Sequence, residues 1–99
     1  MSNREFVLEG DCTFTLRHGA GNKSYTYKIE QSRVDPNLHF VYFVERDSYE
    51  YLGMWCKDTD AFIPAHKYAG PADFAKPSKY RALEYFIRNP SVRKVSMIC

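Results

Sequence analysis

The sequence predicts an α+β fold: a twisted antiparallel sheet of five to seven strands, with one helix from the C-terminal half packed on it. Stretches that alternate apolar and polar residues recur along most of the chain, as in half-buried strands. Short segments rich in Gly, Asn, Asp and Pro separate them, which favours antiparallel pairing of consecutive strands. A single amphipathic helical stripe follows late in the chain. The 99 residues suit one domain, residues 1–99.

The strongest strand signal lies at residues 38–56, where two runs of β-branched and aromatic residues meet at residues 46–48. If Glu45 pairs with Tyr49, one face of this hairpin is expected to be the core face. That face comprises Leu38, Phe40, Tyr42, Val44, Leu52, Met54 and Cys56. The opposite, partly open face comprises Phe43, Tyr49, Tyr51 and Trp55. A register shift of one residue would exchange the faces of one strand.

A first hairpin is expected at residues 12–30, with its turn at residues 18–23. The residues predicted to point inward are Cys12, Phe14, Leu16, Tyr25, Tyr27 and Ile29. Further short strands are expected at residues 5–9, 61–63 and 92–98.

Residues 64–78 contain three prolines and are predicted to form a long loop, anchored by Phe74. The helix is expected at residues 78–88, with Ser78 as its N-cap and a stop at Pro90. Its buried stripe comprises Tyr80, Leu83, Phe86 and Ile87.

Composition narrows the class of protein. No apolar run approaches the roughly 18 residues of a membrane helix, and the polar start MSNRE does not resemble a signal peptide, so a cytoplasmic protein without membrane contact is expected. The three cysteines are widely spaced and odd in number, which favours reduced thiols over a disulfide framework. Residues 76–99 hold six basic residues and one acid, a local excess that suggests an anionic partner or a solvated helix face.

No catalytic or metal signature is present, so neither an enzyme nor a cofactor is expected. Cys56 with His66 or His39 is the one conceivable nucleophile and base, and buried, inert cysteine is far commoner. The histidines and cysteines lack paired zinc spacing. The acids near residue 47 are expected to be solvated rather than catalytic.

With no catalytic or metal signature, the remaining class of function is binding through the protein surface. Aromatic rings and arginines are enriched at the centres of protein interfaces, and an acidic hairpin tip can engage a basic surface. On this interpretation the contact residues are Glu45, Asp47, Glu50, Tyr49 and Tyr51. Alternatively, sheet aromatics stack on the bases of a single-stranded nucleic acid while basic residues neutralise its phosphates. The rings of that alternative are Phe43, Tyr49, Tyr51 and Trp55, and its cations are Arg17, Lys28, Lys79, Arg81, Arg88, Arg93 and Lys94.

The segments CTFTLRHGAGNKSYTYKIE, LHFVYFVERDSYEYLGMW and KPSKYRALEYFI, taken in this order, resemble small proteins of phages and other mobile elements. That group includes anti-CRISPR proteins. The resemblance implies a non-catalytic inhibitor that occupies the surface of a host protein or protein–nucleic-acid complex. It assigns no functional residue.

Overall fold

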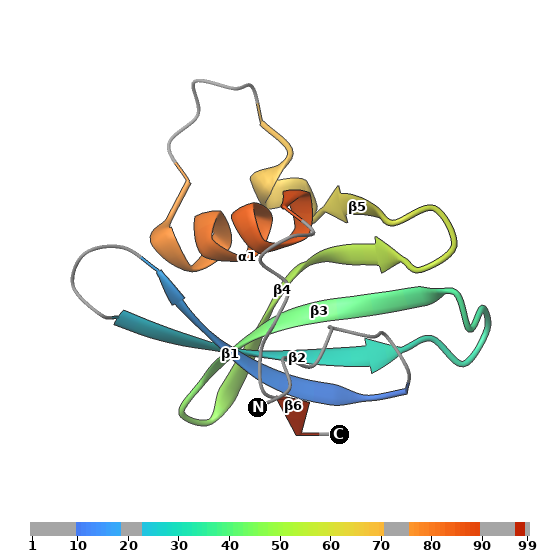
Figure 1. Cartoon of the computed structure of the whole chain (residues 1–99), viewed down its shortest axis with the longest axis horizontal. Helices are drawn as coiled ribbons and strands as arrows, with labels where there is room; N and C mark the ends of the chain where they lie inside the picture. Colours follow the sequence, from blue (N-terminus) through green and yellow to red (C-terminus); the bar gives the residue numbers. More distant parts are fainter. Residues whose placement is uncertain (1–9, 19–22, 71–75, 90–96, 99) are drawn as a thin grey trace, which may run out of the picture.

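The computed structural model describes residues 10–18, 23–70, 76–89 and 97–98. Its strands form one antiparallel sheet in the order β5-β4-β3-β2-β1-β6 (Figure 1). The strands are β1 (Cys12–His18), β2 (Lys23–Gln31), β3 (Leu38–Glu45), β4 (Ser48–Cys56), β5 (Ala61–Pro64) and β6 (Met97–Ile98). The helices are the 3-10 turn η1 (His66–Tyr68) and α1 (Ser78–Arg88). The predicted α+β architecture is confirmed.

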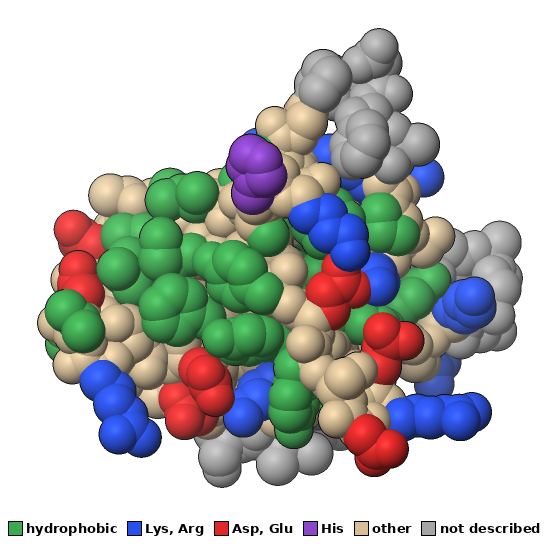
Figure 2. Space-filling model, turned by 180° about the vertical axis from the view of Figure 1, so that it is seen from behind, with side chains coloured by type: hydrophobic (Ala, Val, Ile, Leu, Met, Phe, Trp, Pro, Cys, Tyr) green, Lys and Arg blue, Asp and Glu red, His purple; other side chains and the backbone are tan. Residues whose placement is uncertain are grey.

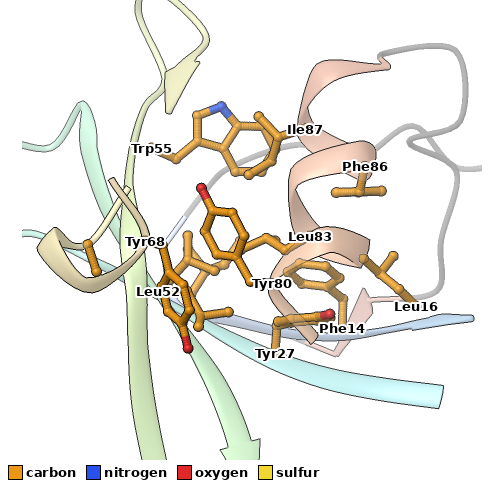
Figure 3. Close-up of a cluster of buried hydrophobic side chains, with 13 residues drawn as sticks. Phe14, Leu16, Tyr27, Leu52, Trp55, Tyr68, Tyr80, Leu83, Phe86 and Ile87 are labelled. Carbon is orange, nitrogen blue, oxygen red and sulfur yellow. The ribbon is translucent and has the colours of Figure 1, made fainter. Parts of the chain in front are cut away.

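Helix α1 and turn η1 lie against one face of the sheet, here called the inner face (Figure 1). The core fills the space between them. Phe14 on β1 stacks on Phe86 of α1 with ring centroids 5.3 Å apart, and Tyr68 of η1 stacks on Tyr80 of α1 at 4.6 Å. Figure 3 shows these rings converging with Trp55 and Leu83. The opposite face of the sheet is called the outer face.

The first hairpin follows the predicted pattern. Cys12, Phe14 and Leu16 on β1 are buried, as are Tyr27 and Ile29 on β2. Tyr25 is half-buried and packs against the same core. The alternation identified these faces because the residues between them are polar, so only one choice of face buries apolar side chains.

In the second hairpin the predicted register holds only at the end far from the turn. His39 is opposite Trp55 and Val41 is opposite Gly53, as expected. Between Val41 and Tyr42 the register shifts through a bulge, and Glu45 then lies opposite Ser48 rather than Tyr49. Since a bulge inserts one extra residue into one strand, it changes which residues point inward beyond it.

The prediction of the core face in this hairpin is wrong. The inner face holds His39, Val41 and Trp55, all buried, together with the partly buried Phe43. Several of the supposed core residues lie on the outer face and are only half-buried: Leu38, Phe40, Tyr42, Val44, Met54 and Cys56. Leu52 is buried as predicted. The runs on β3 and β4 are apolar on both faces, so burial could not be assigned from alternation alone.

Helix α1 begins and ends where the sequence predicts, and its predicted stripe is buried. The N-cap, however, is Pro77 rather than Ser78, and its carbonyl accepts hydrogen bonds from the amides of Tyr80 and Arg81, each at 3.0 Å. The predicted loop before the helix contains η1, whose Tyr68 is buried. Phe74 and the predicted strand at residues 5–9 lie outside the described residues. Of the strand predicted at residues 92–98, only Met97–Ile98 are described, and they form β6.

The two described cysteines, Cys12 and Cys56, differ in oxidation state. Cys12 is disulfide-bonded, so the prediction of reduced thiols is wrong for this residue, whereas Cys56 is free. Spacing along the chain carries no information about distance in the fold, which is why the sequence did not show this bond. Among the described residues, no helix is long and apolar enough to cross a membrane.

Candidate interaction surface

The outer face of β3, β4 and β5 displays aromatic and aliphatic side chains that no described element covers. Tyr49, Tyr51 and Ile63 are 59%, 40% and 53% exposed, respectively. Half-buried neighbours complete what we call the outer-face patch: Phe40, Tyr42, Val44, Tyr49, Tyr51, Met54 and Ile63. Figure 2 shows hydrophobic side chains gathered on this side of the molecule with charged groups around them.

Strand pairing brings the members of the outer-face patch together. Tyr42 on β3 lies opposite Tyr51 on β4, and Met54 lies opposite Phe40 on one side and Ile63 of β5 on the other. Side chains directly opposite each other on one face of a sheet are within contact distance. Residues from three strands therefore form one continuous surface.

The tyrosine rings of the patch pack mainly against each other's edges. The centroids of Tyr42 and Tyr51 are 5.7 Å apart with planes inclined by 58°, and those of Tyr42 and Tyr49 are 6.5 Å apart at 71°. Burial raises the pKa of Tyr42 and of Tyr51 above the ordinary value, so both hydroxyls stay protonated at neutral pH. The rings are mutually supported before any partner arrives.

Charged residues limit the patch along β2. Lys28 lies opposite Tyr42, and Glu30 lies opposite Phe40. The Lys28 Nζ sits 5.1 Å from the centroid of the Tyr49 ring and 3.2 Å from the Glu30 carboxylate. Farther along the outer face, Thr15 and Thr26 join β1 and β2 through their hydroxyls at 3.1 Å. The outer face is thus apolar over β3–β5 and polar over β1–β2.

The turn between β3 and β4 adds two exposed acids next to the patch. Glu45 and Asp47 are both exposed, with Arg46 between them, and Tyr49 follows directly on β4. The structure therefore places four predicted contact residues near one another: Glu45, Asp47, Tyr49 and Tyr51.

Glu50, predicted as an exposed contact residue of the hairpin tip, instead points to the inner side and is engaged in the fold. Its carboxylate pairs with Lys79 of α1, accepts a hydrogen bond from the Tyr68 hydroxyl, and lies 3.0 Å from Lys67 Nζ. Partial burial opposes ionisation, but these three donors outweigh it and lower the pKa of Glu50 to about 2. Glu50 joins β4, η1 and α1.

Three residues of the nucleic-acid alternative, Trp55, Arg81 and Arg88, do not lie on the surface that carries Tyr49 and Tyr51, whereas Lys28, another cation of that alternative, lies over Tyr49. Trp55 is 1% exposed, and its indole N–H donates to the Asp60 carboxylate at 2.8 Å, so its ring is not available for base stacking. Arg81 and Arg88 are exposed on α1, which covers the inner face. Arg93 lies outside the described residues.

Neither candidate base is placed on the same face as the candidate nucleophile Cys56: His39 points to the inner face, and His66 belongs to η1, which lies against that face (Figure 1). Cys56 lies opposite Leu38 on the outer face, whereas the adjacent His39 is buried on the inner face. Hydrogen bonds from Thr59 lower the pKa of the Cys56 thiol. In the described segments, no group of three or more His, Cys, Asp or Glu side chains could hold a metal ion.

Sequence reasoning missed five members of the outer-face patch, because it placed four in the core and gave Ile63 no role. The four taken for core residues are Phe40, Tyr42, Val44 and Met54. Gly53 was the available signal, since a glycine inside a strand pattern often marks a bulge.

No family model, curated protein or solved structure matches this chain.

Proposed function

We propose that this protein is a non-catalytic binding module that docks onto another protein through the outer-face patch and the acids Glu45 and Asp47. The single observation that carries the proposal is the contiguous aromatic area of the outer face, uncovered by any described element. Isolated exposed apolar residues are ordinary on protein surfaces, but a contiguous patch rimmed by charges is typical of interaction sites. Tyrosine supplies a large contact area at small conformational cost.

The arrangement of the rings favours a protein partner over a single-stranded nucleic acid. Base stacking needs open ring faces and nearby cations along the backbone path. Here Tyr42 meets its neighbours at steep angles, and the Lys28 ammonium lies over Tyr49. The acids at the turn repel phosphate, and the exposed arginines of α1 belong to the opposite layer.

Charge complementarity suggests what the partner looks like. An apolar depression bordered by Lys or Arg would receive the patch and pair with Glu45 and Asp47. Proteins that handle nucleic acids present such basic surfaces. Together with the resemblance to phage and mobile-element proteins, this extends the proposal to an inhibitor of a host nucleic-acid-handling complex, of anti-CRISPR type, that acts by occupying the complex's surface.

The test compares two double variants that each remove two exposed side chains. Tyr49→Ser with Tyr51→Ser alters the patch, and Arg81→Ser with Arg88→Ser alters the helix face. Candidate host complexes would be titrated with each protein in a calorimeter, and labelled single-stranded DNA and RNA by fluorescence anisotropy at two salt concentrations.

We expect the tyrosine pair to lower the affinity for the protein partner at least tenfold and the arginine pair to leave it within about twofold. Saturable, salt-sensitive binding of nucleic acid that is lost in the tyrosine variant would instead establish the single-strand alternative. The label is placed on the nucleic acid because the Trp55 ring is buried, so its fluorescence would not report contact with a bound base.

A further inference from the structure

His39 on β3 is completely buried, yet neither nitrogen of its imidazole has a hydrogen-bond partner in the described part of the chain. Buried polar side chains are hydrogen-bonded in most proteins, since an unsatisfied group forfeits its interactions with water. The ring faces the core between Gln31 of β2 and Trp55 of β4, both uncharged.

Two charged residues influence the ring, and their effects oppose each other. Lys57, after the end of β4, disfavours a positive imidazole, while Asp11, before the start of β1, favours it together with the backbone of Asn37. Burial is the strongest influence and lowers the pKa of His39 below its ordinary value. The buried site therefore favours the neutral ring, because burial outweighs the Asn37 backbone and the Asp11 carboxylate, which favour the charged one.

We propose that His39 is an acid-sensitive switch, in which protonation of the buried imidazole opens the ends of β2, β3 and β4 around it. The proton comes from solvent. A charged imidazole buried without an ion-pair partner is unfavourable, whereas strand ends open locally at a fraction of the global free energy of unfolding, and such opening lets water reach the ring.

Short connections hold this end of the sheet closed. The Ser32 amide donates to the Leu38 carbonyl at 2.8 Å, and the Lys57 amide donates to the Asn37 carbonyl at 2.7 Å. Both bonds flank His39, so both amides become exposed when the strand ends separate. Phe40 and Met54 next to this end belong to the outer-face patch, so opening would also weaken partner binding; only this consequence rests on the proposed function.

The first measurement follows the imidazole resonances of the whole protein by NMR from pH 8 to pH 4, together with amide protection factors. We expect His39 to stay neutral below pH 6.5, the ordinary value for histidine. Its protonation should coincide with a loss of protection at Ser32 and Lys57, while amides within α1 remain protected. A His39 ring that protonates with those two amides still protected would overturn the proposal.

The second measurement is the unfolding equilibrium constant as a function of pH, obtained by urea titration. Below pH 6.5 the constant should rise by up to about tenfold per pH unit, because the unfolded chain binds a proton that the folded chain rejects. His39→Leu and His39→Gln should remove this rise, and His66→Gln, at an exposed histidine, should keep it. An unchanged slope in both His39 variants would refute the switch, and the NMR titration decides the matter even if neither variant folds.

Discussion

Gly53 lies where the β3–β4 hairpin changes register, opposite Pro64 at the end of β5. Its backbone has a φ of +156°, and a Cβ added there would lie 2.3 Å from the Phe62 Cζ and 2.7 Å from the Ile63 carbonyl oxygen. No real Cβ tolerates such distances, so the ring or the strand must move. The bulge determines which residues of β4 point to the inner face and which to the outer face. It requires glycine at position 53, because any side chain there would clash.

Gly53→Ala is expected to lower the free energy of unfolding by about 2–4 kcal/mol, from overpacking plus backbone strain. Urea denaturation monitored by Trp55 fluorescence measures it. Gly10→Ala is the matched control, because Gly10 also has a positive φ, +66°, with no atom within 4 Å of the added Cβ. That variant should lose about 1 kcal/mol, from the backbone alone. Equal losses in the free energy of unfolding at both glycines would show that the clash with Phe62 does not add to the cost of Gly53→Ala.

Glu50 is the second residue on which the arrangement of elements depends. Glu50→Gln removes the charge that holds Lys79 and Lys67, and at neutral pH it should cost about 1–3 kcal/mol of unfolding free energy. The folded pKa of about 2 lies below the ordinary 4.5, so this stabilisation is complete above pH 4.5 and disappears as the pH falls toward 2. The difference between wild type and variant should shrink over that interval in urea titrations.

The exposed turn residue Glu45 provides the comparison for Glu50. Glu45→Gln should change stability by less than about 0.5 kcal/mol, as is usual for exposed charges. A Glu50→Gln penalty that stays constant from pH 5 to pH 2 would mean that the carboxylate's charge is not what stabilises the cluster.

At the scale of single elements, α1 is stabilised mainly by what it covers. Its first turn contains no acidic residue and its N-cap supplies no side-chain hydrogen bond, so local capping adds little. The helix instead buries Leu83 and Phe86 against the sheet. An amphipathic helix of this length depends on such packing rather than on propensity.

Leu83→Ala should therefore lower the free energy of unfolding by about 2–5 kcal/mol, through lost burial and the cavity that remains. Arg81→Ala, on the exposed side of the same helix, should change it by no more than about 0.5 kcal/mol. Chemical denaturation of both variants measures the contrast. Similar effects at the two positions would mean that α1 is not docked through this stripe.

The elements also show where sequence reasoning succeeds. On β1 and on α1, polar residues separate the apolar ones at the period of a strand or a helix, and the predicted buried residues are buried. On β3 the run LHFVYFV is apolar on both faces, and His39, in the middle of it, is completely buried, as is Val41. When both faces of a strand are apolar, alternation does not show which face is buried. The bulge on β4 also reverses the side to which the following residues point, and a strict period of two does not predict that reversal.

The same limit applies to the candidate site. Tyr49 and Tyr51 are exposed as expected, but the bulge places them with Tyr42 on the outer face and not with Trp55, as the predicted register had it. The exposure of Glu45 and Asp47 follows from the turn itself. Glu50 could not be placed, because its partners Lys67, Tyr68 and Lys79 come from elements whose docking depends on the whole fold.

At the scale of the whole molecule, the sheet has two unlike faces. The inner face is closed by α1 and η1 over an aromatic core, whereas the outer face over β3–β5 is covered by no described element (Figures 1 and 2). The exposed arginines of α1 and the acids of the β3–β4 turn occupy separate regions. A partner that meets the outer-face patch therefore contacts tyrosines and acids, not the basic helix.

The most direct test of that claim uses two exposed tyrosines on opposite layers, Tyr51 on the outer face and Tyr85 on α1, which are 40% and 54% exposed. A photo-crosslinking phenylalanine analogue replaces one or the other, and the protein is irradiated in cells of its source organism. We predict a discrete, nuclease-resistant protein adduct from position 51 that excess wild-type protein suppresses and the Tyr49→Ser, Tyr51→Ser variant does not. An adduct only from position 85, a nuclease-sensitive one from position 51, or none from position 51 would contradict the account.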